Sequence, residues 1–242
     1  MERAVLPGDP PVEIRVRRSA RARRFSLRVA QADGGVTLSL PRVARLDDAM
    51  AFVQAQEGWI RRTLARQPEM TPVCAGATLP FEGRPVSIVV APEQRVAELR
   101  DDRLLLPVRS RSLGAQVAGY LKTAARTRLA AACDRHAAAL GRRFRAITLR
   151  DTRSRWGSCT SEGRLMFSWR LIMAPPEVLD YVAAHEVAHL AEMNHSPAFW
   201  AEVALLCPDY RARRGWLRTH GAGLHRFDFA APPAPAGGAS GD

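Results

Sequence analysis

The chain has 242 residues, 47% of them hydrophobic and 25% charged, so it is long enough to bury a sizeable core. No apolar run reaches the roughly 18 residues of a membrane span, and the start has no apolar signal segment. We therefore expect a cytoplasmic protein without membrane association. The four cysteines form no CxxC pair, which argues against a disulfide framework and a cysteine-based zinc ribbon.

The formal net charge is +12, and Lys122 is the one lysine among the 36 basic residues. Such a balance favours anionic partners, which include nucleic acid and nucleotides. A GC-rich genome would give the same arginine surplus without any function, and composition alone is compatible with both origins.

The first part of the chain predicts mostly strands. Residues 1–11 have the character of a loose leader. Between residues 12 and 40 apolar and polar residues alternate, which indicates strands, and Asp33–Gly35 predicts a hairpin turn between two of them. Residues 46–66 have helical periodicity, with Pro68 as the terminator, and 76–108 return to strand patterns. We therefore expect a β-rich N-terminal region over residues 1–111.

The second part predicts helices around a small sheet. A long helix over 113–140 ends at Gly141, and strands follow at 144–151 and 164–169. Proline-initiated helices are predicted after residue 175 and after Ser196, and the last helix precedes a low-complexity tail. These patterns predict an α+β catalytic domain over 112–229 and a disordered tail over 230–242.

The run HEVAH places two histidines four residues apart. On a helix this spacing presents His185 and His189 on one face, and Glu186 lies beside them. Zinc lowers the pKa of a bound water and polarises a carbonyl, and a neighbouring carboxylate can take and return the proton. Because the flanking residues are apolar, the helix is expected to be buried, and a metal would supply partners for its polar groups.

A catalytic zinc needs a third protein ligand. A continuous helix would carry His195 to the wrong face, about 9 Å from His189 along the axis. We therefore expect the helix to break near Glu192–Asn194, where Asn194 tolerates the left-handed conformation that a break needs, so that His195 returns to the site. Glu192 and Glu202 are the alternatives for this position.

The run YVAAHEVAHLAEMNHSPAFW, with RSRWGSC before it and PDYRARRGWL after it, resembles the YgjP-like (DUF45) family of zinc metallohydrolases, classed as M48-type metallopeptidases. RRSARARRFSLRV, near the N-terminus, also fits this family. The resemblance implies a zincin-like fold, one Zn²⁺ ion bound by His185, His189 and His195, and Glu186 as the general base. The resemblance to SprT-like proteases is weaker, and the metzincin pattern is matched in its histidines only, because Glu192 replaces its glycine.

Further polar residues are candidates for substrate contacts. Arg153 and Arg155 could bind a carboxylate or a phosphate, and Trp156 could form a turn beside a cleft strand. Packing of Trp156 in the core and solvated arginines are the alternative. Tyr210 and His220 could donate to an oxyanion, whereas Cys159 has no neighbouring histidine or cysteine in the sequence that would make it a nucleophile or ligand.

Three functions fit these observations. The first is a zinc-dependent metallopeptidase that cleaves peptides or proteins, with strand 164–169 holding the substrate extended. The second is a metal-dependent hydrolase of nucleotide phosphoanhydrides on the same scaffold, which the arginines would suit although no phosphate-binding loop is present. The third is a basic nucleic-acid-associated protein with a structural zinc.

Overall fold

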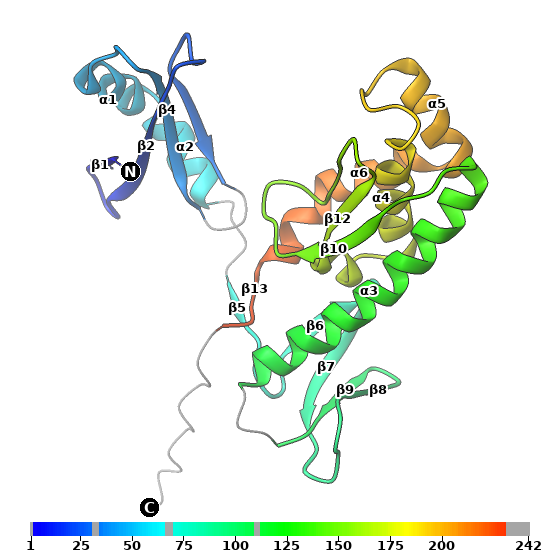
Figure 1. Cartoon of the computed structure of the whole chain (residues 1–242). Coiled ribbons are helices and arrows are strands. Elements are labelled where there is room, and N and C mark those ends of the chain that lie inside the picture. Colours follow the sequence, from blue (N-terminus) through cyan, green and yellow to red (C-terminus); the bar gives the residue numbers. More distant parts are fainter. Residues whose placement is uncertain (1, 31–33, 66–69, 109–111, 231–242) are drawn as a thin grey trace, which may run out of the picture. The chain divides into compact units, whose positions relative to one another are not determined.

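The computed structural model describes residues 2–30, 34–65, 70–108 and 112–230, and the chain divides into two compact units, Met1–Glu69 and Met70–Asp242 (Figure 1). Helices and strands are mixed, which confirms the expected α+β class. Within these described ranges, none of the helices combines the length and apolar character that a bilayer crossing requires. Asp33 and residues 231–242, to which the predicted turn and tail extend, lie outside them.

The N-terminal unit is one four-stranded sheet with two helices. Its strands lie in the order β1-β2-β4-β3 and are β1 (Glu2–Leu6), β2 (Val12–Ser19), β3 (Ser26–Val29) and β4 (Val36–Pro41). Alternate residues such as Ile14 and Leu38 are fully buried and pack with Ala49 and Val53 of α1 (Leu46–Ala55) and Ile60 of α2 (Glu57–Ala65). Buried and more exposed residues alternate along β2 and β4, so one face of the sheet packs against α1 and α2. Within the described residues, the opposite face of the sheet has no helix of this unit packed on it.

Two expectations for this unit were wrong. Residues 2–6 are not a loose leader, since β1 pairs with β2 in antiparallel register and buries Leu6. The helix predicted over 46–66 is two helices separated at Gln56, where the backbone leaves the helical region (φ −102°, ψ 8°). Gln56 still accepts the amide of Ile60 through its carbonyl oxygen, so the second helix starts immediately.

The C-terminal unit begins with a second four-stranded sheet in the order β6-β7-β9-β8. Its strands are β6 (Thr78–Phe81), β7 (Arg84–Val90), β8 (Glu98–Arg100) and β9 (Arg103–Leu106). Buried Ile88 and Leu104 share one core with Leu121 and Val182 from the later helices. The two units therefore divide at 69/70, whereas the sequence predicted the division at 111/112. The strands between residues 76 and 108 resemble those of the N-terminal unit in pattern, but they pack in the core of the second unit.

The remaining elements form the second half of this unit. They are α3 (Leu113–Leu140), β10 (Ala146–Arg150), β11 (Gly157–Cys159), β12 (Arg164–Ser168), η1 (Trp169–Met173), α4 (Pro176–Ala188), α5 (Pro197–Leu206), α6 (Tyr210–His220) and η2 (Gly221–His225). A short parallel pair joins β5 (Thr71–Pro72) to β13 (Phe227–Asp228). Figure 1 shows α3 running from the β6–β9 sheet at one end to the β10–β12 sheet, and it contacts both.

The helix ends follow local sequence signals. Ser112 Oγ accepts from Ala115 N at the start of α3, and Gly141 closes α3 with a left-handed conformation (φ 64°). Ser196 Oγ accepts from Phe199 N at the start of α5, and proline occupies the first turns of α4 and α5. These local signals fix where the site helices begin.

Arg170 of η1 ties the C-terminal segment to the core. Its buried guanidinium donates to both carboxylate oxygens of Asp151, at 2.6 and 3.2 Å, and to the carbonyl oxygens of Leu224 and Phe227 at 3.1 Å. Because every donor direction but one is used, the segment after α6 is held firmly against the sheet.

Candidate metal centre

Three histidines converge at the carboxyl end of α4. Nitrogen atoms of His185, His189 and His195 lie within 4.8 Å of one another, and Nε2 of His185 and Nε2 of His195 are 3.1 Å apart. His185 comes from the last turn of α4, His189 follows that helix directly, and His195 precedes α5. The structure therefore brings together the three histidines that the sequence singled out.

The chain returns to the site earlier than expected. Helix α4 ends at Ala188, and the amides of Leu190 and Ala191 bond to Val187 and Ala188 three residues back, which tightens the last turn. Among the described residues, the non-glycine positions with positive φ are Glu82 and Asp101, so Asn194 is not left-handed. The helix therefore ends a few residues before the expected 192–194, although the amide of Glu192 still bonds to the carbonyl oxygen of Ala188, and the return to the site does not use a left-handed Asn194.

The ring of His189 is oriented by the backbone of the turn. Its Nδ1 lies 3.0 Å from the carbonyl oxygen of Glu192, and because a carbonyl only accepts, Nδ1 carries the proton. The lone pair of Nε2 then points to the cluster, as metal-binding histidines require. Glu192 thus supports the site through its backbone, and neither its carboxylate nor that of Glu202 joins the cluster.

Aromatic rings surround the three imidazoles. Phe199 is fully buried, and its ring centroid lies 4.9, 4.4 and 4.7 Å from those of His185, His189 and His195. Trp200 stacks on His195 at 5.8 Å, so both aromatic residues of α5 restrict how the ligand rings can turn.

Burial keeps His185 in the neutral form that binds metals. It lowers the pKa of His185 to about 3, and the neighbouring His189, His195 and Arg214 act in the same direction. Burial also lowers the pKa of His189, although its bond to the Glu192 carbonyl opposes this. A metal ion would therefore displace few protons from these rings.

Glu186 is 5% exposed and faces the sheet beside the histidines. Burial raises the pKa of its carboxyl to about 8, against the lowering charge of Arg155, and a cation bound nearby would lower it again. A Cβ atom built on Gly157 would overlap Glu186 Oε1 and lie 2.6 Å from Glu186 Cγ. The glycine of β11 therefore makes room for this carboxylate.

Strand β11, and not β12, borders the site. Strand β12 is paired on both sides, parallel with β10 and antiparallel with β11, so it has no edge for a substrate. The expectation that strand 164–169 pairs with substrate was therefore wrong. Strand β11 ends the sheet, packs against α4 and brings Gly157 against Glu186.

The other candidate residues lie around this edge. Arg155 is exposed and its charge reaches Glu186, whereas Arg153 is exposed and its charge acts on His225. Trp156 packs: it stacks on His225 at 5.1 Å, and a Cβ on Gly221 would lie 3.0 Å from its ring. The ring thus anchors the segment that carries Arg155 and Gly157.

Cys159 and His220 are not part of the histidine cluster, and Tyr210 packs on Trp200 beside it. The ring of Tyr210 stacks on Trp200 at 5.4 Å, and its hydroxyl accepts from Arg211 Nε at 3.3 Å. Burial and the charge of Glu186 raise the pKa of Cys159 to about 11, which makes a thiolate at this position unfavourable. His220 packs near Trp216 at 5.1 Å.

The sequence reasoning missed Arg214 and Gly157. The guanidinium of Arg214 lies 4.8 Å above the ring of Trp200, on the helix that also carries Tyr210 one turn earlier. Helical spacing from Tyr210 could have identified Arg214, whereas no local signal marks a glycine that packs against a distant carboxylate.

Comparisons with known proteins relate the chain to one family. The family described as YgjP-like, metallopeptidase domain, matches residues 23–220. No curated protein matches the chain. Among solved structures, the crystal structure of the metallopeptidase zymogen of Pyrococcus abyssi abylysin has 22% sequence identity and a TM-score of 0.34, with 38% of this chain and 92% of that chain covered. Because the family match spans most of the sequence, including the histidine cluster, the chain belongs to the YgjP-like family of metallopeptidases and is a metal-dependent peptidase in its general class.

Proposed function

We propose that this protein is a zinc-dependent peptidase in which His185, His189 and His195 hold one Zn²⁺ ion and Glu186 acts as the general base. The observation that supports this most is the convergence of three imidazole nitrogens within 4.8 Å beside a buried carboxylate. Such a set of three protein ligands with one neighbouring acid is typical of catalytic zinc sites.

The residues fit the ion in distance and in tautomer. Tetrahedral zinc with bonds of about 2.0–2.1 Å separates two ligand nitrogens by about 3.3 Å. The Nε2 atoms of His185 and His195 are 3.1 Å apart, close to this value. The bond from His189 Nδ1 to the Glu192 carbonyl leaves its Nε2 for the metal.

Each residue then has one task in peptide hydrolysis. The zinc ion, when bound, acidifies a water and polarises the scissile carbonyl. Glu186 accepts a proton from the attacking water at its carboxylate and returns it to the leaving amine nitrogen. Because Glu186 is buried against Gly157 of β11, its carboxylate is held in one orientation and little bulk water competes for it.

We infer that an extended peptide pairs with β11. This strand ends the three-stranded sheet and carries Gly157 beside Glu186, so a peptide added there would run past the reacting groups. The exposed Arg155 lies at the start of this edge, and its charge suits an acidic side chain or a carboxylate of the substrate. Tyr210 would support this side of the site through the ring of Trp200, on which it stacks.

A structural zinc is less consistent with this set of ligands. Structural sites use four protein ligands, whereas within the described residues the cluster holds three. The buried Glu186 would also have no role in a structural site, although its burial is costly.

Hydrolysis of matched substrate panels tests this function. Wild type and Glu186→Gln, each loaded with zinc, would be incubated with unfolded proteins, with mixed peptides and with nucleoside triphosphates. We expect peptide cleavage by wild type alone, with equal zinc content in both proteins, and loss of zinc in His189→Ala. Release of phosphate or pyrophosphate without peptide cleavage would overturn the peptidase assignment in favour of a nucleotide hydrolase. Normal peptide turnover by Glu186→Gln would overturn the general-base role.

A further inference from the structure

The strand register of the N-terminal unit gathers arginines on the sheet face that has no helix. Arg3 lies opposite Arg15, and both Arg15 and Arg28 lie opposite Thr37, so one row across four strands carries three arginines. Arg17 lies in the next row, and all four arginines are exposed. We call Arg3, Arg15, Arg17 and Arg28 the arginine face.

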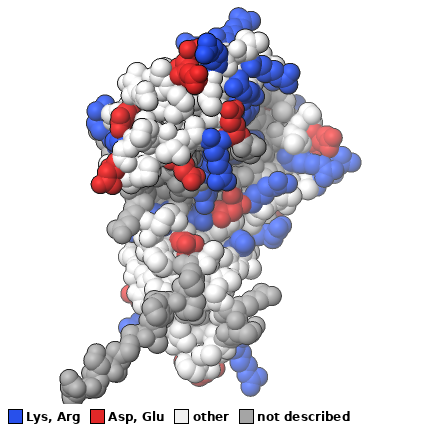
Figure 2. All heavy atoms as spheres, turned by 90° about the vertical axis from the view of Figure 1, so that its left-hand side faces the viewer, with Lys and Arg blue, Asp and Glu red and all other residues white. Residues whose placement is uncertain are grey.

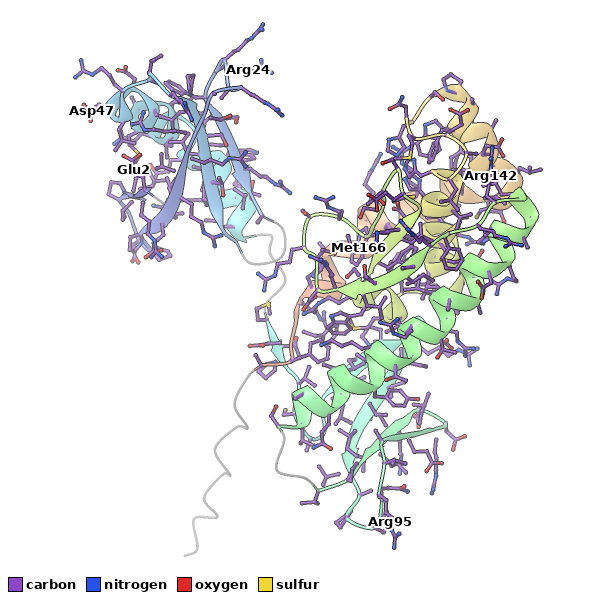
Figure 3. The ribbon with its side chains drawn as sticks, in the orientation of Figure 1. Glu2, Arg24, Asp47, Arg95, Arg142 and Met166 are labelled. Carbon is purple, nitrogen blue, oxygen red and sulfur yellow. The ribbon has the colours of Figure 1, made fainter. Side chains whose placement is uncertain are left out.

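The loop between β2 and β3 extends this basic surface. Arg21, Arg23 and Arg24 are exposed there, and Figure 3 shows Arg24 at the tip of the unit, pointing away from the sheet. From Arg15 to Arg28 the sequence contains seven arginines and no acidic residue. Arg18 has a structural role, since it donates to the carbonyl oxygens of Arg42 and Ala44.

Acidic residues of this unit lie mostly elsewhere. Asp47 and Asp48 occupy the first turn of α1, and Figure 3 places Asp47 and Glu2 away from the arginine-rich tip. In Figure 2 basic side chains gather at the top and along the right of the view, with acidic side chains between them. The acid on the arginine face itself is Glu13, 3.8 Å from Arg3. Codon bias would raise the arginine content everywhere, but it would not sort the two charges onto different faces.

The chemistry of the face selects one kind of anion. Besides the arginines it presents hydroxyl groups of Ser26, Thr37 and Ser39, which donate to phosphate oxygens, and it carries no aromatic ring among the described strand residues. Without rings for base stacking, contacts would be made to the sugar-phosphate backbone. We propose that the arginine face binds the phosphate backbone of double-stranded nucleic acid without reading its sequence.

This binding is proposed separately from the peptidase function, because its residues belong to the N-terminal unit and the three histidines to the other. Phosphate contacts release counterions, so binding should weaken steeply as salt is added. The logarithm of the association constant should fall linearly with the logarithm of the salt concentration, by about 0.9 for each phosphate contact. Loss of three contacts should reduce that slope by about three.

The test measures binding of the full chain to a fluorescent 20-base-pair duplex by anisotropy over a salt series. The face variant combines Arg15→Gln, Arg17→Gln and Arg28→Gln, and the matched control combines Arg45→Gln, Arg62→Gln and Arg142→Gln, with the same change in net charge. We expect a slope lower by about three for the face variant and an unchanged slope for the control. If the face variant does not fold, as judged by circular dichroism, the loop variant Arg21→Gln, Arg23→Gln, Arg24→Gln carries the same expectation.

Three results would overturn the proposal. One is the absence of duplex binding by wild type at low salt, and another is an equal slope in the face and control variants. The third is displacement of the duplex by poly-glutamate at equal charge concentration, which would assign the face to acidic polypeptides. Peptide hydrolysis by the face variant should equal that of wild type, so failure of this proposal and failure of the peptidase proposal are distinguishable.

Discussion

Replacement of Gly157 by alanine tests whether β11 positions the general base. A Cβ atom at this position would overlap Glu186 Oε1 and lie 2.6 Å from Glu186 Cγ, whereas ordinary contacts begin near 3.4 Å. The carboxylate must therefore move by roughly 1 Å, and misplacement of that size in an active site costs about 10²-fold in rate. The atoms nearest to that Cβ all belong to Glu186 and none to a histidine, so zinc content should be unchanged.

The assay is kcat/KM for a peptide substrate, together with zinc content and the melting temperature. We expect kcat/KM to fall about 100-fold, with one zinc per chain and a loss of stability of about 1–3 kcal/mol from overpacking. Gly215→Ala is the matched control, because no atom outside the adjoining helix backbone lies within 4 Å of its added Cβ and alanine favours the α6 helix by about 1 kcal/mol. Wild-type kcat/KM in zinc-loaded Gly157→Ala would refute the reasoning.

Three further changes probe the surroundings of the site. Trp200→Leu removes the ring stacked on His195, so zinc affinity measured by chelator competition should fall about tenfold, and unchanged affinity would show that the stack does not orient this ligand. Arg170→Met leaves two carbonyl oxygens and Asp151 unpaired, and urea unfolding should show a loss of about 3 kcal/mol; a loss under about 1 kcal/mol would contradict the anchoring role. Burial lowers the pKa of His225 to about 4 from 6.5, so the unfolded chain binds the proton first and stability falls as the pH drops through this range. His225→Phe should reduce the stability lost between pH 7 and 4.5 by about 2 kcal/mol, and an identical loss in both proteins would exclude this contribution.

Elements with local signals were predictable from the sequence. Helix α3 has its stop at Gly141, and α5 has its cap at Ser196, and both signals act within a few residues of the chain. The position of His185 and His189 on one face likewise follows from their spacing of four residues on a helix. His195 was predictable as the third member, because a catalytic zinc needs three protein ligands.

Features that depend on distant partners were not predictable. Strand β1 forms because its backbone pairs with the edge of β2, and the five residues 2–6 are too few for an alternation of apolar and polar residues to indicate a strand. The unit boundary depends on the shared core of Ile88 and Leu121, which no linker composition marks. The contact of Gly157 with Glu186 joins a strand and a helix that are separated in sequence, and only the folded arrangement reveals it.

X-ray absorption at the zinc edge of the wild-type chain, loaded with one equivalent of zinc, tests the central claim most directly. The three-histidine site predicts a shell of nitrogen and oxygen atoms at about 2.0–2.1 Å with the scattering pattern of three imidazoles, and two imidazoles in His195→Ala. A sulfur atom at about 2.3 Å, which would bring a cysteine such as Cys159 into the site, would contradict it. An unchanged spectrum in His195→Ala would contradict it equally.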